Sequence, residues 1–202
     1  MIKIVIFDFD DTLYSDKNPK PWRDYCLNAI EFFLQKRSDY QQIMDEVLTR
    51  SFSDNQLIAF LKNYDVREEI INDYFKTHQV EDGTFDNCTI VSDESLASFA
   101  NHFKLFIVSN SKKESVVKNM SILNINPRYF IDIISNTETS KTHAYQDIIK
   151  KHNISPEELL VIGNSYNSDI LPALEIGANG RVVRSANFIF NDFFDDNCNL
   201  KC

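Results

Sequence analysis

The sequence lacks long hydrophobic runs, and this absence bears on where the protein works. No apolar stretch in its 202 residues approaches the ~20 residues needed to span a bilayer. The N-terminal apolar run Ile4–Phe7 stops at Asp8, which is too short for the hydrophobic part of a signal peptide. We therefore expect a cytoplasmic protein with no membrane partner.

Cysteine and glycine are also scarce, with four residues of each. The cysteines, Cys26, Cys88, Cys198 and Cys202, form no C-x-x-C pair, and no histidine lies at the spacing of zinc ligands. We expect free thiols in a reducing compartment. Because glycines are so few, the position of Gly163 within a motif described below is more informative than usual.

Basic residues are fewer than acidic ones, 21 against 30, so the net charge is −9 and the pI about 4.9. Such a field repels polyanions, which argues against nucleic acid and anionic membranes as partners. A small phosphorylated substrate requires local cations or a metal ion inside a cleft. The 43% hydrophobic and 25% charged content is ordinary for a folded protein, and the length fits one domain carrying an inserted module.

Apolar spacing indicates a strand followed by a helical block. Residues Ile2–Phe9 are apolar and β-branched, as in a short buried strand. No strand pattern occurs between Pro21 and Asn87. In this interval the i, i+3, i+4 spacing of apolar residues predicts helices over Trp22–Lys36, Tyr40–Thr49, Asn55–Tyr64 and Arg67–Thr77.

From Ser92 onward, helical and strand patterns alternate. Helices are predicted over Asp93–Asn101, 111–123, Thr142–His152 and Ser168–Ile176, and strands over Lys104–Ser109, Phe130–Ile134, Leu159–Ile162 and Arg181–Val183. The sequence Ser111-Lys-Lys-Glu114 has the form of a capping box that opens the first helix after Ser109.

This alternation predicts an α/β fold. We expect a Rossmann-like parallel sheet with helices on both faces and an inserted all-α module, with the core formed by residues 1–14 and 90–202 and the insertion by residues 15–89. The aromatic tail from Ala186 to Cys202 is expected to pack on the edge of the sheet or to form a dimer contact.

Polar residues lie where the predicted parallel strands end, which is where such sheets bind ligands. Each of these groups alone is more often a solvated turn or a helix cap. Together they place carboxylates, a hydroxyl group and an ammonium group at one edge of one sheet. They are Asp8-Phe9-Asp10-Asp11-Thr12, Ser109-Asn110, Lys141 and Gly163-Asn164-Ser165-Tyr-Asn-Ser-Asp169.

The sequence I-V-I-F-D-F-D-D-T-L, followed in order by L-F-I-V-S-N, by Lys141 and by V-I-G-N-S-Y-N-S-D-I, resembles the haloacid dehalogenase (HAD) superfamily. The resemblance covers Ile2 to about Val183, and the helical block resembles the C1 cap of that superfamily. It implies a Mg²⁺-dependent phosphatase that hydrolyses a small phosphorylated metabolite, of the nucleotide or sugar phosphate class, through an aspartyl-phosphate intermediate. The D-D-T-L-Y string is similar to that of pyrimidine 5′-nucleotidase-like members.

The chemistry of the residues supports the same roles. Asp8 would be the nucleophile, and Asp10 the general acid for the leaving alcohol and then the base that activates water. We place Thr12 among the substrate-binding residues, and we expect it to hold Asp10 by a hydrogen bond. The Ser109 hydroxyl and the Asn110 N–H would bind phosphoryl oxygens, and Lys141 would neutralise their charge.

Magnesium needs hard oxygen ligands, which Asp8, Asp10 and either Asn164 or Asp169 would supply together with water. The resemblance implies that Asp10 contributes its backbone carbonyl. Asn164 stands where the family usually has aspartate, so the site loses one negative charge, worth roughly 4 kcal/mol at ~4 Å and an effective dielectric near 20. Asp169 would either replace that charge at the metal or orient Lys141.

Two alternatives stay open: a catalytically weak HAD-fold binding or regulatory protein, motivated by Asn164, and a phosphomutase. Haloacid dehalogenase activity itself is disfavoured, because those enzymes do not carry the second aspartate of the first motif, which is present here as Asp10. A response-regulator receiver domain has no room for the long insertion between Thr12 and Ser109. We expect a monomer or a weak homodimer.

Overall fold

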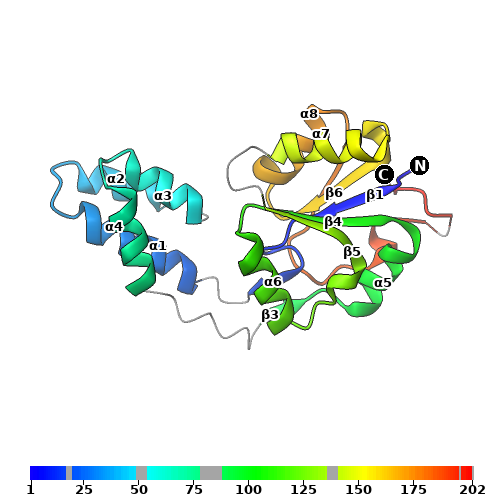
Figure 1. The fold of residues 1–202 in the computed structure, drawn as a ribbon, viewed down its shortest axis with the longest axis horizontal. Coiled ribbons are helices and arrows are strands. Elements are labelled where there is room, and N and C mark those ends of the chain that lie inside the picture. Colours follow the sequence, from blue (N-terminus) through cyan, green and yellow to red (C-terminus); the bar gives the residue numbers. More distant parts are fainter. Residues whose placement is uncertain (17–19, 49–53, 78–87, 136–140, 196, 202) are drawn as a thin grey trace. The chain divides into compact units, whose positions relative to one another are not determined.

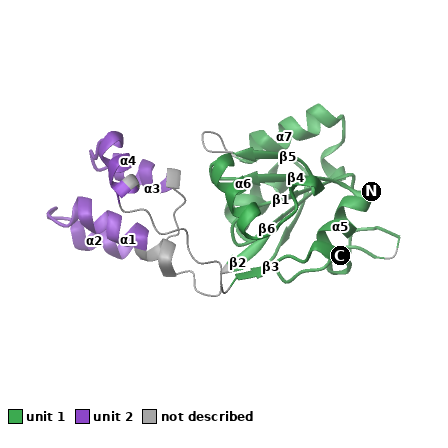
Figure 2. Cartoon of the chain, turned by 60° about the horizontal axis from the view of Figure 1, so that its bottom comes forward, with its two compact units in different colours: residues 1–17, 88–202 green, residues 18–87 purple. Residues whose placement is uncertain are grey.

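The computed structural model describes residues 1–16, 20–48, 54–77, 88–135, 141–195 and 197–201 (Figure 1). The chain divides into two compact units (Figure 2): residues 1–17 with 88–202, and residues 18–87. Every helix within the described ranges is too short or too polar to cross a membrane.

The first unit is built on a five-stranded sheet in the order β5-β4-β1-β6-β7. All of its pairings are parallel, which confirms the predicted Rossmann-like α/β fold. Phe7 in the central strand pairs with Ile107 on one side and with Ile162 on the other, so the chain leaves all three strands at the same edge of the sheet. The strands are β1 (Ile4–Phe7), β4 (Lys104–Ser109), β5 (Phe130–Ser135), β6 (Leu159–Gly163) and β7 (Asn179–Val182).

Helices cover both faces of this sheet, as Figure 1 shows. On one face α7 (Lys141–His152) and α8 (Leu171–Glu175) pack on alternate strand residues such as Ile4 and Ile6. On the other face lie α5 (Asp93–His102) and α6 (Lys113–Ile122). Burial on both faces explains why β1 is apolar at every position instead of alternating.

The C-terminal tail packs mainly on the α5 face of the sheet, and it also reaches the expected sheet edge, where Arg181 of the edge strand β7 donates a hydrogen bond to the Lys201 carbonyl. The Phe188 ring stacks on Phe7 with ring centroids 6.0 Å apart, and it lies 6.3 Å from Phe99 of α5. The Ser95 hydroxyl donates a 3.2 Å hydrogen bond to the Phe188 carbonyl. Phe188, Phe193 and Phe194 of the tail are therefore part of the buried core on this face.

A second, two-stranded sheet was not predicted. In it β2 (Tyr14–Asp16) pairs antiparallel with β3 (Cys88–Ile90), with Tyr14 opposite Ile90. Each strand has three residues, and the partners are far apart in sequence, so neither carries a local periodic pattern. These strands are the last element before the helical unit and the first element after it.

The second unit consists, in its described part, of α1 (Lys20–Leu34), α2 (Tyr40–Val47), α3 (Asp54–Lys62) and α4 (Glu68–Thr77). The helices predicted from apolar spacing match these four within a few residues at each end. The apolar faces that predicted them form a separate core, which includes Ala29, Ile30, Leu34, Ile43, Leu57, Leu61 and Ile71.

Candidate active site

Asp8 is the first residue after the central strand. Its backbone N–H donates to the Ile162 carbonyl at 2.9 Å. The pairing with β6 therefore continues one residue past β1 and fixes the direction in which the chain leaves the strand. The side chain is buried. Its Oδ1 atom accepts a hydrogen bond from Lys141 Nζ at 2.7 Å, and its Oδ2 atom accepts one from Thr12 Oγ1 at 3.2 Å. Two donors from different elements thus orient this carboxylate.

The expectation that Thr12 holds Asp10 is wrong, because the Thr12 hydroxyl donates to Asp8. The local turn explains the difference. The Phe9 carbonyl accepts from the N–H groups of Thr12 and Leu13, at 3.3 and 3.0 Å, so the chain winds through one helix-like turn. Residues four apart face each other in such a turn, and Thr12 comes back over Asp8.

Lys141, the first residue of α7, is buried with two carboxylates. Its Nζ atom lies 2.7 Å from Oδ1 of Asp8 and 2.7 Å from Oδ1 of Asp169. Burial lowers the pKa of Lys141, but the two carboxylates outweigh it and raise the pKa above its usual value. Lys141 therefore stays charged, as the predicted role in neutralising phosphate requires.

Asp169 lies in a π-helical turn, Tyr166–Ile170, directly after β6. Its Oδ2 atom accepts from the Ser165 N–H at 2.9 Å, and Oδ1 accepts from the Ser168 hydroxyl at 3.1 Å as well as from Lys141. The predicted single helix over Ser168–Ile176 is instead this turn followed by α8. Pro172, in the first turn of α8, has no N–H to continue an α-helical ladder from the preceding turn.

Gly163, at the end of β6, is required for this arrangement. A Cβ atom at this position would overlap the Asp169 carboxylate. The scarce glycine therefore marks a close approach between the strand end and the aspartate. The neighbouring Asn164 is exposed.

Asp10 is held by hydroxyl groups on both of its carboxylate oxygens. Tyr14 Oη donates to Oδ1 at 2.7 Å, and Ser111 Oγ donates to Oδ2 at 2.6 Å. Ser109, which is fully buried, adds a longer 3.4 Å contact to Oδ2. Ser109 thus lies at the predicted site beside Asp10, and Asn110 follows it in the chain.

The sequence motifs do not predict the contacts of Ser111 and Tyr14 with Asp10. The predicted capping box at Ser111 does not form, because α6 begins two residues later and has Lys112 at its N-cap, with no side-chain cap. The Ser111 hydroxyl turns instead to Asp10. Two sequence features could have indicated these contacts. Ser111 lies two residues after Ser109, which ends a strand, and Tyr14 lies four residues after Asp10.

Negative charge exceeds positive charge in this cluster, because the carboxylates of Asp8 and Asp169 contact the ammonium group of Lys141 and the charge of Asp10 also acts on Asp8. Burial raises the pKa of Asp8 to about 7, and the charges of Asp169 and Asp10 add to this effect against the opposing effect of Lys141. A divalent cation beside Asp8 would offset the excess charge. The residues therefore fit a metal ion electrostatically.

The side chains do not fit a site made of three carboxylates. Within the described ranges, no three His, Cys, Asp or Glu side chains are grouped so that they could hold a metal ion. Asp169 and Asp10 each accept three hydrogen bonds from protein donors, whereas Asp8 accepts two and keeps more of its acceptor capacity. Asp8 is therefore the carboxylate of this cluster with the most capacity left to bind a cation, and Mg²⁺ accepts such hard oxygen ligands along with water.

Comparison with known families agrees with this arrangement. The family model of haloacid dehalogenase-like hydrolases matches residues 2–177. The chain belongs to this family. It is a HAD-like hydrolase, as its motifs predicted. No curated protein matches the sequence.

Solved structures share the fold of this HAD-like hydrolase at low sequence identity. A HAD phosphatase from Thermococcus onnurineus is 18% identical, with a TM-score of 0.55 over 94% of this chain and 92% of the other. A HAD family enzyme from Bacteroides thetaiotaomicron, in complex with magnesium and inorganic phosphate, is 14% identical, with a TM-score of 0.53 over 96% and 100%. A 2-haloacid dehalogenase from Pseudomonas syringae is 16% identical, with a TM-score of 0.52 over 89% and 85%. The fold therefore does not choose between phosphatase and dehalogenase chemistry.

Proposed function

We propose that this HAD-like hydrolase is a Mg²⁺-dependent phosphatase that hydrolyses a small phosphorylated metabolite, of the nucleotide or sugar phosphate class, through an aspartyl-phosphate on Asp8. One observation carries the proposal. A buried carboxylate at the end of the central strand is ion-paired with Lys141 at 2.7 Å, and a second carboxylate, Asp10, is held two residues further on. A nucleophile and an acid–base group are thus present together.

The reaction proceeds in two steps. A carboxylate oxygen of Asp8 bonds to phosphorus while the bond from phosphorus to the leaving oxygen breaks, and Asp10 gives that oxygen a proton. Asp10 then takes a proton from water as the water attacks the acyl phosphate, which releases inorganic phosphate and restores the Asp8 carboxylate. Lys141, the Ser109 hydroxyl and the Asn110 N–H balance the charge on the phosphoryl oxygens.

We assign the Asp8 carboxylate, the Asp10 main-chain carbonyl and the Asn164 amide oxygen as the groups that would hold Mg²⁺. The ion supplies positive charge to the phosphoryl oxygens and to Asp8 when it is bound. The structural neighbour from Bacteroides thetaiotaomicron, which holds magnesium and phosphate, supports the choice of Mg²⁺ as the ion. Asp169 acts on Lys141 in this proposal, because it already accepts three hydrogen bonds and one of them comes from Lys141.

We assign the helical unit, residues 18–87, as the C1 cap of the family, which would select the substrate. Its core is separate from that of the sheet, as expected for a module inserted into a loop. The net charge of −9 favours a small anionic substrate bound with a metal over nucleic acid or a membrane surface. We place the enzyme in the cytoplasm, as a monomer or a weak homodimer.

Dehalogenation is the second candidate, because a 2-haloacid dehalogenase shares the fold. Asp10 argues against it. A halide leaves as an anion and needs no proton, so a carboxylate clamped beside Asp8 would have no role as an acid. A catalytically weak binding protein would keep the site without turnover, and a phosphomutase would return the phosphoryl group to a sugar.

The test measures phosphate release from p-nitrophenyl phosphate and from a panel of nucleotides and sugar phosphates, with Mg²⁺ or with EDTA. Chloride release from 2-chloropropionate and formation of isomeric sugar phosphates are measured in parallel. We expect Mg²⁺-dependent phosphate release that Asp8→Asn abolishes. The matched control is Asp132→Asn, which removes the carboxylate of an exposed lysine pair, 3.0 Å from Lys113, and should keep full activity. Activity in Asp8→Asn, or chloride release in place of phosphate release, would overturn the proposal.

A further inference from the structure

We propose that Tyr14 and Ser111 are positioning residues that clamp Asp10 for proton transfer, an inference that rests on the proposed function. The Tyr14 hydroxyl lies 2.7 Å from Asp10 Oδ1, and the Ser111 hydroxyl lies 2.6 Å from Asp10 Oδ2. One donor comes from strand β2 and the other from the segment between β4 and α6. The sequence motifs assign neither residue a role at Asp10.

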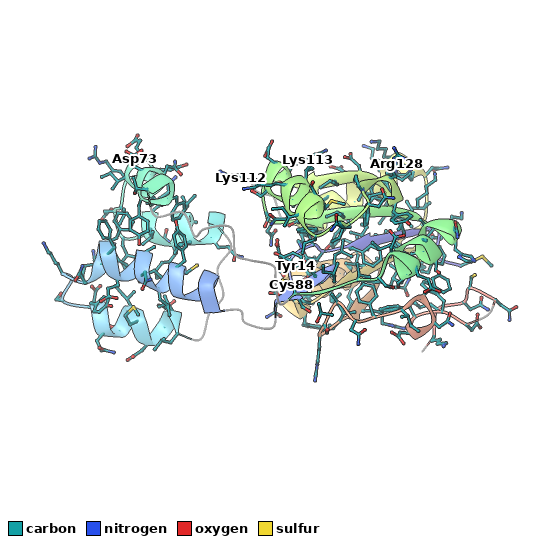
Figure 3. The ribbon with its side chains drawn as sticks, turned by 90° about the horizontal axis from the view of Figure 1, so that it is seen from below. Tyr14, Asp73, Cys88, Lys112, Lys113 and Arg128 are labelled. Atoms are coloured by element: carbon teal, nitrogen blue, oxygen red, sulfur yellow. The ribbon has the colours of Figure 1, made fainter. Side chains whose placement is uncertain are left out.

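Tyr14 reaches Asp10 from a fixed backbone. It is the first residue of β2, and its pairing with Ile90 of β3 holds the strand; Figure 3 labels Tyr14 beside Cys88 at this strand pair. The ring packs on Phe9, with centroids 5.3 Å apart. The hydroxyl acts as the donor in this contact, because an ionised carboxylate can only accept a hydrogen bond.

Ser111 is held on both sides of its Cα atom. Its N–H donates to Ser109 Oγ at 3.0 Å, and its carbonyl accepts from the Ser135 hydroxyl at 2.8 Å. These bonds tie the segment to the ends of β4 and β5. With the main chain anchored in this way, the short Ser111 side chain has its hydroxyl directed at Asp10.

The two bonds stop the Asp10 carboxylate from rotating. A carboxylate has about four acceptor positions, so two strong donors leave positions for the proton that Asp10 transfers. Proton transfer depends on an oxygen being at hydrogen-bond distance from the reacting atom, and a small misplacement has a large effect on rate. The clamp should therefore affect kcat and leave substrate binding nearly unchanged.

The two halves of the reaction need Asp10 to different degrees. p-Nitrophenolate leaves readily without a proton, so the first step with p-nitrophenyl phosphate depends little on Asp10. Hydrolysis of the aspartyl-phosphate depends on Asp10 as base with every substrate. Loss of the clamp should therefore slow the second step more, and phosphoenzyme should accumulate. A general loss of structure would not produce this pattern.

The experiment compares the wild type with Tyr14→Phe, Ser111→Ala and Ser111→Thr, using p-nitrophenyl phosphate and Mg²⁺. The controls remove equivalent hydroxyls elsewhere. Tyr129→Phe loses a 2.9 Å bond to Asp93, and Ser98→Ala loses a 2.9 Å bond to the Glu94 carbonyl. The readouts are kcat, KM, the burst of p-nitrophenol, the fraction of phosphoenzyme by intact mass, and thermal unfolding as a check on folding.

We expect kcat to fall about tenfold or more in Tyr14→Phe and Ser111→Ala, with KM falling in parallel so that kcat/KM changes less than about twofold, together with a p-nitrophenol burst and accumulated phosphoenzyme. Ser111→Thr, which keeps the hydroxyl, should recover most of kcat, and the controls should match the wild type. Unchanged kcat, or a lower kcat without phosphoenzyme, would overturn the inference alone. Absence of phosphatase turnover in the wild type would overturn the proposed function and this inference with it.

Discussion

The ammonium group of Lys141 lies 2.7 Å from the carboxylate of Asp169. Both groups are almost completely buried, and Asp169 receives further hydrogen bonds from Ser165 and Ser168. Asp169 is thereby occupied as a partner of Lys141, which in turn reaches Asp8. The sequence left two roles open for Asp169, as a metal ligand or as a residue that orients Lys141. The contact favours the second role, and the two roles predict different effects of mutation.

Asp169→Asn should reduce kcat by about tenfold or more, because Lys141 loses the charge that holds it between the two aspartates. The Mg²⁺ concentration at half-maximal rate should stay nearly constant. Ser168→Ala removes only a 3.1 Å hydrogen bond to the same carboxylate and serves as the control, with a small effect on kcat. A variant restored to full rate by excess Mg²⁺ would show that Asp169 is a metal ligand.

Asn164→Asp should strengthen Mg²⁺ binding. The added charge lies beside the proposed ion at an exposed position, where water screens it, so we expect about a tenfold lower Mg²⁺ requirement. Asn167→Asp adds the same charge to an exposed residue three positions later, in the turn Tyr166–Ile170, and is the matched control. Titration of phosphatase rate against Mg²⁺ measures both, and equal effects of the two substitutions would exclude Asn164 as a ligand.

The metal-free enzyme should become less stable as pH rises from about 4 to about 7. Burial raises the pKa of Asp8 to about 7 from 3.8, so the folded state binds a proton that the unfolded chain has already released. The stability that this proton contributes, at most about 4 kcal/mol, is lost as pH rises through the folded-state pKa. Asp8→Asn does not ionise and should lack this decline.

Thermal unfolding of the wild type and Asp8→Asn in EDTA, between about pH 5 and pH 8, checks this expectation. The thermal stability of Asp8→Asn should rise relative to that of the wild type as pH increases. Added Mg²⁺ at pH 8 should stabilise the wild type more than the variant. Parallel pH profiles for the two proteins would contradict the raised pKa of Asp8.

Phe188→Ala should destabilise the fold by about 3 kcal/mol or more, because this buried ring of the tail packs on Phe7 and Phe99. The adjacent Ile189 is 53% exposed, and Ile189→Ala should change the free energy of unfolding by less than about 0.5 kcal/mol. Denaturant unfolding of both variants gives the comparison. Similar values would mean that the tail does not belong to the core in solution.

Much of the fold and part of the site could be predicted because their signals are local. The strand that ends at Asp8 and the strand that ends at Ser109 are continuous apolar runs, and Lys141 begins a helix with a clear apolar face. Parallel pairing then brings their ends to one edge of the sheet. The strands β2 and β3 were missed because each has three residues and finds its partner only after the intervening helical unit.

The sequence by itself determined which chemical groups the site contains: two aspartates two residues apart, a serine at a strand end, a lysine at a helix start and a glycine before the last cluster. The tertiary structure decided which of these groups contact one another. The Thr12 hydroxyl donates to Asp8, the Ser111 hydroxyl donates to Asp10 and does not cap a helix, and Asp169 accepts from Lys141. Spacing along a chain limits which strand ends meet, but a hydrogen bond depends on side-chain direction within a few tenths of an ångström, and packing of distant elements sets that direction.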